Sequence, residues 1–220
     1  MQGCKAARIA YSRSLKISVR SVISVANFLL PRKFYNRPTL IVARELIGAQ
    51  LVRILDGVKL VGIITETEGY IGEEDQACHA KAGRTPRTLP MYGPPGHAYV
   101  YFTYGHHWML NAVTEKEGFP AAVLIRAVWP VEGAEIMSKR RDGRDTFGPG
   151  KLTQAMGIGR AENQVDLTES ASGLWIEAGA PVPDSAVTIS PRVGLYTVPE
   201  PWKSKPWRFL VKRYSIFEKR

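Results

Sequence analysis

Two glutamates and a tyrosine recur at alternate positions in the segment 64–79, which reads ITETEGYIGEEDQACH. The run KLVGIITETEGY is rich in β-branched residues and alternates as a half-buried strand does. Side chains alternate between the two faces of a strand, so Glu66, Glu68 and Tyr70 share one face. Carboxylates that act as acids or bases need such rigid placement at the wall of a pocket. The segment is therefore a candidate active-site wall or, alternatively, a solvent-facing sheet edge with ordinary surface acids.

Aromatic rings are concentrated in the sequence around these acids. They are Tyr70, His79, Tyr99, Tyr101 and Tyr104. Core packing is the simpler explanation for any one of these rings. Together, beside a carboxylate-bearing strand, they favour a polar pocket that stacks a planar heterocycle.

One arginine stands inside an otherwise apolar run, AAVLIRAV. A charged group in such a run, here Arg126, is usually paired or catalytic. A metal site is an alternative, for which the possible ligands are Glu66, Glu68, His79, His106 and His107. No HExxH or CxxC spacing supports a metal, and no GxSxG motif supports a serine hydrolase. The residues favour acid–base chemistry instead.

The elements that must position these residues are short strands and a few helices. Spacing of apolar residues predicts helices over 39–47, 131–141 and 148–158. The turn Asp56-Gly57 predicts a hairpin, and further strands are expected over 99–104, 108–114, 121–128, 174–178, 186–195 and 206–212. This pattern predicts an α+β fold: a single compact domain with a curved, mostly antiparallel β-sheet and flanking helices.

Composition narrows the classes of protein that the chain can belong to. Of its 220 residues, 45% are hydrophobic and 23% are charged, as in soluble globular proteins. No run approaches the roughly 18–20 apolar residues of a membrane span, so we expect no membrane association. Only two cysteines are present, which favours a reducing compartment: the cytoplasm or nucleoid if the source is bacterial.

The net charge of +10 is unevenly distributed. The chain has no Asp or Glu before Glu45, and residues 1–34 form a basic N-terminal extension. This extension is typical of a basic arm, of organelle targeting or of a wrongly assigned start, and the domain is expected over 35–220. Two further basic clusters, 139–160 and 203–220, could contact nucleic acid.

Several of these segments together resemble one known family. In order, they are ETEGYIGEEDQACHA, RTPR, MYGPPGHAYVYFTYGHHWMLNAVTE, AVLIRAV and GPGKLTQAMGI. This combination closely resembles the alkyladenine (3-methyladenine) DNA glycosylase family, from roughly Pro38 to Phe217. The resemblance implies a monofunctional, monomeric enzyme that needs no metal or cofactor. Its substrate would be double-stranded DNA containing damaged purines: 3-methyladenine, 7-methylguanine, hypoxanthine or ethenoadenine. It would flip the damaged base out of the duplex and hydrolyse its N-glycosidic bond, which starts base excision repair.

The resemblance also implies roles for individual residues. Glu68 would activate water as the general base, and Arg126 would help to position that water and the carboxylate. A carboxylate beside an arginine is expected to remain ionised. The remaining roles are aromatic walls around the flipped base at Tyr70, His79 and Tyr101, discrimination against guanine at Asn111, and a wedge in the vacated stack at Tyr104.

Contacts with the DNA backbone are expected from Arg84, Arg87, His106 and Lys151. His106 departs from the family, which often has methionine there, and could make DNA binding pH-dependent. Two alternatives remain open at this point. One is a non-catalytic duplex-binding protein on the same scaffold, and the other is a glycosylase with lyase activity through Lys151.

Overall fold

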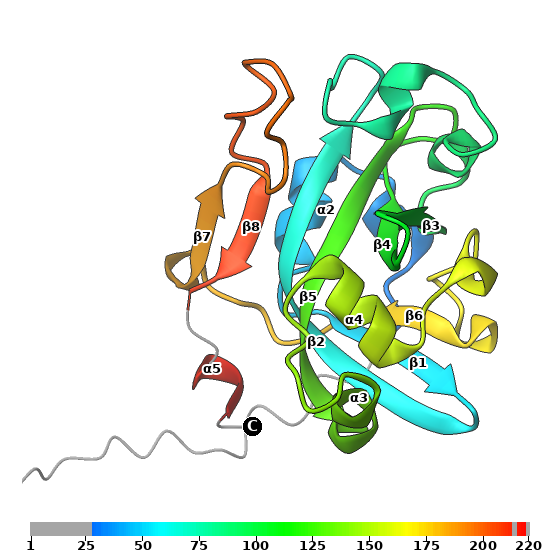
Figure 1. Cartoon of the computed structure of the whole chain (residues 1–220), viewed down its shortest axis with the longest axis vertical. Helices are drawn as coiled ribbons and strands as arrows, with labels where there is room; N and C mark the ends of the chain where they lie inside the picture. Colours follow the sequence, from blue (N-terminus) through cyan, green and yellow to red (C-terminus); the bar gives the residue numbers. More distant parts are fainter. Residues whose placement is uncertain (1–27, 213–214, 219–220) are drawn as a thin grey trace, which may run out of the picture.

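The computed structural model describes residues 28–212 and 215–218, so the predicted extension over residues 1–27 lies outside the described part (Figure 1). Eight strands form one sheet: β1 Gln50–Leu55, β2 Val58–Ile71, β3 Ala98–Thr103, β4 His107–Val113, β5 Ala121–Glu132, β6 Leu174–Glu177, β7 Val187–Ser190 and β8 Arg208–Val211. The α-helices are α1 Arg32–Tyr35, α2 Thr39–Glu45, α3 Ala134–Arg140, α4 Pro149–Met156 and α5 Ser215–Glu218. The expected α+β fold with one mostly antiparallel sheet is confirmed.

The sheet is antiparallel throughout and is organised around the long strand β2. Its strand order is β3-β4-β5-β2-β1-β6, and β8 pairs with both β2 and β7. Strand β5 runs along one side of β2, while β1 and then β8 occupy the other side. Strand β2 is therefore an interior strand, and the sheet-edge interpretation of its glutamates is wrong.

A β-bulge marks the point where β2 exchanges β1 for β8. The pairing with β5 shifts register between Ile64 and Glu66 and again between Glu66 and Thr67. Bulges bend a strand and re-aim its side chains. Beyond this bulge, β2 carries Glu66 and Glu68 into the region where β5 and β8 flank it.

Two tight turns set the register of the hairpins. Asp56 and Gly57 both have positive φ, at 50° and 79°, as the type I′ turn between β1 and β2 requires. Tyr104 and Gly105 repeat this conformation between β3 and β4, with φ of 52° and 72°. The second turn places a tyrosine at the tip of a hairpin in a conformation that favours glycine or asparagine.

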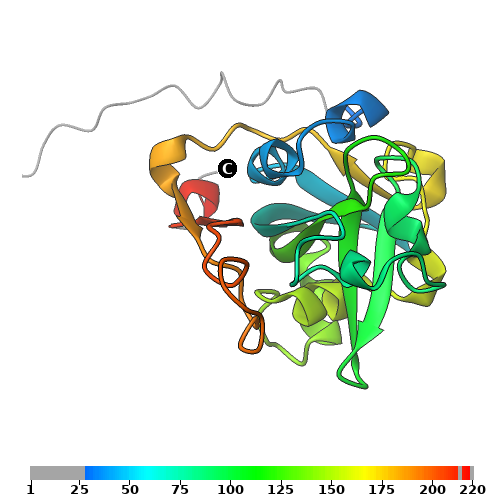
Figure 2. The ribbon, with the colours of Figure 1, turned by 90° about the horizontal axis from the view of Figure 1, so that it is seen from above.

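The helices cover opposite faces of the sheet. Helix α2 lies behind the sheet in Figure 1 and α3 and α4 lie in front of it, an arrangement that the view from above also shows (Figure 2). Helix α4 begins with Pro149 in its first turn and ends at Gly157 in the left-handed conformation, as the GPGKLTQAMG sequence predicted.

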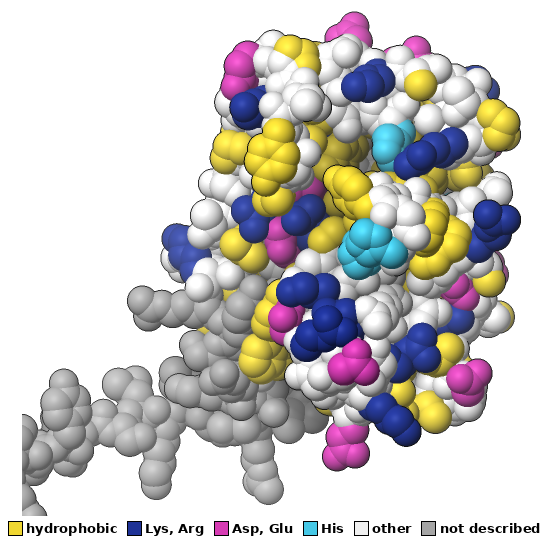
Figure 3. Space-filling view, in the orientation of Figure 1, with side chains coloured by type: hydrophobic (Ala, Val, Ile, Leu, Met, Phe, Trp, Pro, Cys, Tyr) yellow, Lys and Arg dark blue, Asp and Glu magenta, His cyan; other side chains and the backbone are white. Residues whose placement is uncertain are grey.

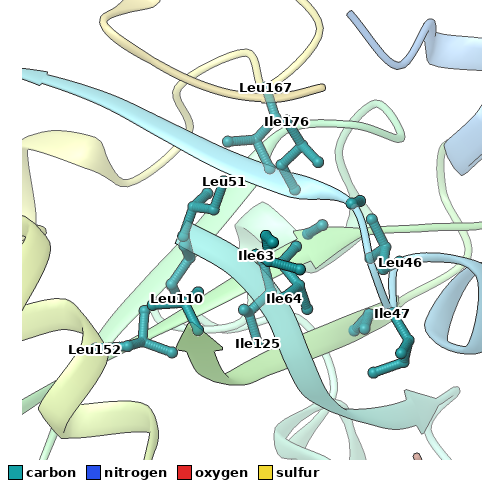
Figure 4. Close-up of a cluster of buried hydrophobic side chains, with 14 of the residues drawn as sticks. Leu46, Ile47, Leu51, Ile63, Ile64, Leu110, Ile125, Leu152, Leu167 and Ile176 are labelled. Atoms are coloured by element: carbon teal, nitrogen blue, oxygen red, sulfur yellow. The ribbon is translucent and has the colours of Figure 1, made fainter. Parts of the chain in front are cut away.

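The main core lies between the sheet and these helices. It includes Leu46, Leu51, Ile64, Leu110, Ile125, Leu152, Leu167 and Ile176, all fully buried and drawn in Figure 4. Burial of each such side chain stabilises the fold by about 1.5–3 kcal/mol. The core thus fixes β2, β4 and β5, the strands that carry the candidate catalytic residues.

Two segments differ from their sequence-based description. The expected strand over 186–195 ends at Ser190, because Pro191 has no N–H to continue the ladder. Residues 191–207 instead form a loop that extends beyond the ends of β7 and β8 before the chain returns as β8 (Figure 1). At the other end of the chain, Leu30 and Phe34, which the sequence assigned to the extension, pack in or against the main core.

Candidate active site

A cavity of about 310 Å³ opens between the β3–β4 hairpin, the end of β2 and the loop 191–207. Its lining includes seven residues singled out from the sequence: Tyr70, His79, Tyr99, Tyr101, Tyr104, Asn111 and Arg126. The polypeptide brings these residues together from four strands, a 3-10 helix (His79–Ala82) and a hairpin tip. The other lining residues include Met91, Met109, Leu124, Val193 and Leu195.

Strand register explains why these side chains meet. Glu68 pairs with Leu124 on β5, Leu124 pairs with Asn111 on β4, and Asn111 pairs with Tyr99 on β3. Residues directly opposite one another in an antiparallel sheet project to the same face. Leu124, Asn111 and Tyr99 of this cross-strand row line the cavity, and Glu68 continues the row on β2, buried behind the lining.

Glu68 is completely buried and accepts three hydrogen bonds. Its Oε2 accepts from Tyr70 Oη at 2.9 Å and from Arg126 Nη1 at 3.3 Å. Its Oε1 accepts from the backbone N–H of Val193 at 2.7 Å. These contacts hold the carboxylate in a single orientation, which is what a general base requires.

Burial raises the pKa of Glu68 above its ordinary value, although Arg126, the Val193 N–H and the Tyr70 hydroxyl all act to lower it. The expectation that the neighbouring arginine alone would decide the charge of this carboxylate is therefore incomplete. A carboxylate with a raised pKa accepts a proton from water more readily than an ordinary one. Burial and the nearby Glu68 also raise the pKa of Tyr70, so its hydroxyl remains a donor.

A second carboxylate lies beside this pair. Glu66 Oε1 accepts from Arg126 Nε at 2.7 Å and from Arg208 Nε at 2.6 Å. Glu66 has an exposed fraction of only 6%. Two glutamates and two arginines therefore form a continuous network of ion pairs, which meets the cavity at Arg126.

Aromatic rings form part of the wall of the cavity. The ring of His79 meets that of Tyr101 edge to face, with centroids 4.5 Å apart, and Tyr99 lies 5.2 Å from Tyr101. His79 Nδ1 is 3.0 Å from Tyr99 Oη. Asn111 Nδ2 donates to Tyr99 O at 2.9 Å, which fixes the amide in the cavity.

His79 is expected to titrate far below the usual histidine range. Burial, aided by Arg87 and Lys81, lowers its pKa to about 4. The folded protein therefore binds this proton less readily than the unfolded chain, so His79 reduces stability as pH falls from its ordinary pKa toward 4. An NMR titration of the histidine ring protons should show His79 still neutral at pH values where exposed histidines are charged. Titration of His79 near its ordinary pKa would contradict the described environment.

The rim of the cavity carries an exposed aromatic side chain. Tyr104, at the tip of the β3–β4 hairpin, has an exposed fraction of 75%. Lys and Arg side chains gather on the same face of the molecule, over α3 and α4 (Figure 3). An exposed ring beside a cavity, on a basic face, suits contact with a polyanion that carries planar groups.

Each of the four residues expected at the DNA backbone contacts a neighbouring side chain. The guanidinium of Arg84 stacks on Tyr92 at 4.6 Å, and that of Arg87 lies 5.2 Å from the centroid of Tyr101. Lys151 Nζ pairs with Asp145 at 3.1 Å. The ring of His106 lies 4.0 Å from that of its neighbour His107 on the hairpin. Their contacts with DNA remain predictions.

Metal-binding and membrane-spanning features can be assessed only for the described residues. Within residues 28–212 and 215–218, no three His, Cys, Asp or Glu side chains come together to hold a metal ion. The alternative metal site considered from the sequence therefore does not form among these residues. Over the same part of the chain, no helix is long and apolar enough to cross a membrane.

Comparison with known proteins identifies the family. A family model described as "Methylpurine-DNA glycosylase (MPG)" matches residues 33–215. The chain belongs to the methylpurine-DNA glycosylase family. It is 49% identical over 197 residues to a protein of Methanocella arvoryzae, covering 87% of this chain and 96% of that protein. It is also 49% identical over 183 residues to a protein of Myxococcus xanthus, covering 83% of this chain and 90% of that protein. Both relatives are named "Putative 3-methyladenine DNA glycosylase".

Membership of this glycosylase family confirms the resemblance found in the sequence and, with it, an enzyme of DNA repair that acts on DNA. Two parts of the site escaped the sequence interpretation. Arg208 is the first residue of β8 and lies in the basic cluster 203–220, so its charge did not stand out in the sequence as that of Arg126 did. The N–H of Val193 carries no sequence signal, because any residue except proline could supply it.

Proposed function

We propose that this glycosylase flips damaged purines out of duplex DNA and hydrolyses their bond to deoxyribose with a water activated by Glu68. A base must leave the duplex before its glycosidic bond can be reached, at a cost of a few kcal/mol that is smaller for damaged pairs. One observation carries the proposal. An aromatic-lined cavity has Arg126 in its lining, with the fully buried Glu68 paired to that arginine, and an exposed tyrosine at its rim.

The aromatic wall would hold the flipped base by stacking. Purines alkylated at ring nitrogens are cationic, so they are good leaving groups and are attracted to the electron-rich faces of tyrosines. Tyr70, His79 and Tyr101 would supply those faces. The amide of Asn111, held by Tyr99 O, would oppose the amino group of normal guanine.

Cationic lesions are expected to be released faster than neutral ones. Hypoxanthine and ethenoadenine must gain a proton to leave readily, and His79, with its pKa of about 4, is a poor donor near neutral pH. The experiment is to measure single-turnover release from duplexes containing 7-methylguanine, 3-methyladenine, hypoxanthine or ethenoadenine. Release of none of these bases would contradict the proposal, and equal rates for all four would contradict the assigned chemistry.

Tyr104 is expected to fill the gap that the flipped base leaves. Stacking between a base and an aromatic side chain contributes about 1–3 kcal/mol, so Tyr104→Ala should weaken binding to lesion duplexes by roughly that free energy. The melting temperature should hardly change, because the ring is exposed. Equilibrium binding of a labelled lesion duplex checks this. The matched control is Ile189→Ala, an exposed apolar side chain on β7, which should leave binding unaltered.

Two further properties are proposed on the same basis. The protein would act as a monomer, which light scattering in the presence and absence of a lesion duplex can test. It would work in the cytoplasm or nucleoid if the source is bacterial. A fusion of residues 1–37 to a fluorescent reporter would show whether the N-terminal segment directs it elsewhere.

A further inference from the structure

We propose that Glu66 and Arg208 are positioning residues for this reaction. Arg208 fixes Glu66, Glu66 fixes Arg126, and Arg126 in turn sets the placement of the Glu68 carboxylate and the pH range in which it acts as a base. The inference rests on the proposed function, because it concerns the residues that prepare Glu68.

The first support for the inference is that Glu66 contacts both arginines. A single oxygen, Glu66 Oε1, accepts both the Nε of Arg126 at 2.7 Å and the Nε of Arg208 at 2.6 Å. The side chains of Glu66, Arg126 and Arg208 are 8%, 13% and 21% exposed. A carboxylate buried to this extent is stable as an anion only when cations compensate it. Both arginines are therefore parts of one structural unit with Glu66.

The orientation of Arg126 follows from these contacts. Its Nε–H is committed to Glu66, and this leaves Nη1 to face Glu68 Oε2 at 3.3 Å. The guanidinium is planar and rigid, so fixing one edge fixes the direction of the others. Without Glu66, Arg126 could rotate to present two N–H groups to Glu68.

The register between β2 and β8 places Arg208 within reach of Glu66. Arg208 on β8 is the direct partner of Glu68, and Leu210 is the partner of Glu66. The side chain of Arg208 extends diagonally along the sheet to reach Glu66 Oε1, two residues before its own partner. Diagonal neighbours on antiparallel strands lie within reach of long side chains. The loop 191–207 precedes Arg208, so β8 connects the Val193 wall of the cavity to this network.

The charges around Glu68 give the inference its direction. The charged or titratable groups that face it from the elements packed against it are Glu66 and Tyr70 of β2, Arg126 of β5, Arg208 of β8, Tyr101 of β3 and, across the Tyr70 ring, Arg192 paired with Asp75. Without the charge of Arg208, the Glu66 carboxylate is paired with Arg126 alone, and its negative charge then opposes ionisation of Glu68 more strongly. Without the charge of Glu66, this repulsion is absent and ionisation of Glu68 becomes easier.

The test measures the rate of single-turnover release of 7-methylguanine as a function of pH at saturating enzyme. The acid limb of this profile is the low-pH range in which the rate falls as the general base becomes protonated. Arg208→Gln should move this limb to higher pH by roughly 0.5–1 unit, and Glu66→Gln should move it to lower pH by a similar amount. Arg208→Lys should recover part of the Arg208→Gln shift. The matched control is Arg53→Gln, which breaks a similarly buried ion pair with Glu162 outside the cavity and should leave the limb in place.

Opposite shifts of the two variants would support the inference. An unmoved acid limb in both variants would overturn it and leave Arg208 with only the structural role of joining β8 to β2. If Arg208→Gln does not fold, Glu66→Gln and Arg208→Lys still decide the matter by the direction of their shifts. Failure of the proposed function is separate: a Glu68→Gln variant that retained release would remove Glu68 as the base, whatever the limb does.

Discussion

Glu68→Gln is expected to abolish base release while it leaves binding to lesion duplexes nearly intact. General bases contribute about 10²–10⁴-fold to a reaction rate, and an amide cannot accept the proton from water. Gln has almost the shape of Glu, so its oxygen can still accept the hydrogen bond from the Val193 N–H that Glu68 accepts. The measurements are the single-turnover rate of release and the dissociation constant for the same duplex.

The same substitution is not expected to unfold the protein. Burial holds the pKa of Glu68 above its ordinary value, so ionisation of this group costs stability as pH rises above the pKa that the group has in the unfolded chain. A neutral amide removes that cost at neutral pH. The control is Glu132→Gln, at an exposed glutamate on β5 that pairs with Lys59. It should leave both release and binding unchanged.

Asp75→Asn is expected to cause the largest loss of stability. Asp75 and Arg192 form a bidentate ion pair, with N–O distances of 2.5 and 2.9 Å, and both side chains are fully buried. Removing one partner of a buried pair leaves an uncompensated charge, which costs about 3–5 kcal/mol. Arg192 also donates to Gly69 O and Trp202 O, so it fastens the loop 191–207 to β2.

Urea unfolding at neutral pH measures this effect. Asp184→Asn is the matched control, because Asp184 pairs with Arg44 through a side chain that is 96% exposed. Exposed pairs contribute about 0–1 kcal/mol, so the control should differ little from the unmodified protein. Equal losses in the two variants would show that the Asp75–Arg192 pair does not fasten the loop. Asp75→Asn should lose more stability than the control. It should also release bases more slowly, because the loop holds the Val193 N–H against Glu68.

The sequence predicted those parts of the fold that depend on local patterns. Alternation identified the face of β2 that carries Glu68, and Asp56-Gly57 identified its hairpin, because strand geometry and turn preference act over a few residues. The exposure of that face could not be derived in this way. It depends on β8, which comes from about 140 residues later in the chain and pairs with β2 beyond the bulge, and on the loop before β8, whose Val193 N–H contacts Glu68.

The candidate site was predictable where a residue type is unusual for its position. Arg126 stood out in an apolar strand, whereas Arg208 lies among the other basic residues of 203–220 and did not. The contacts of the Val193 N–H and of Glu66 could not be derived, because they depend on where the loop 191–207 and β8 pack. The direction of the Glu68 pKa was also beyond the sequence, since burial outweighs the adjacent arginine only in the folded protein.

The central claim is that an activated water, and no amine of the protein, displaces the damaged base. The most direct test is to incubate the protein with methylated duplex DNA in the presence of borohydride and to quantify free bases and protein–DNA adducts together. We predict free 3-methyladenine and 7-methylguanine, one abasic site for each base released, and no trapped adduct. A trapped adduct that disappears in Lys151→Ala would contradict the claim by showing lyase chemistry, and binding without release would contradict it by showing a non-catalytic protein.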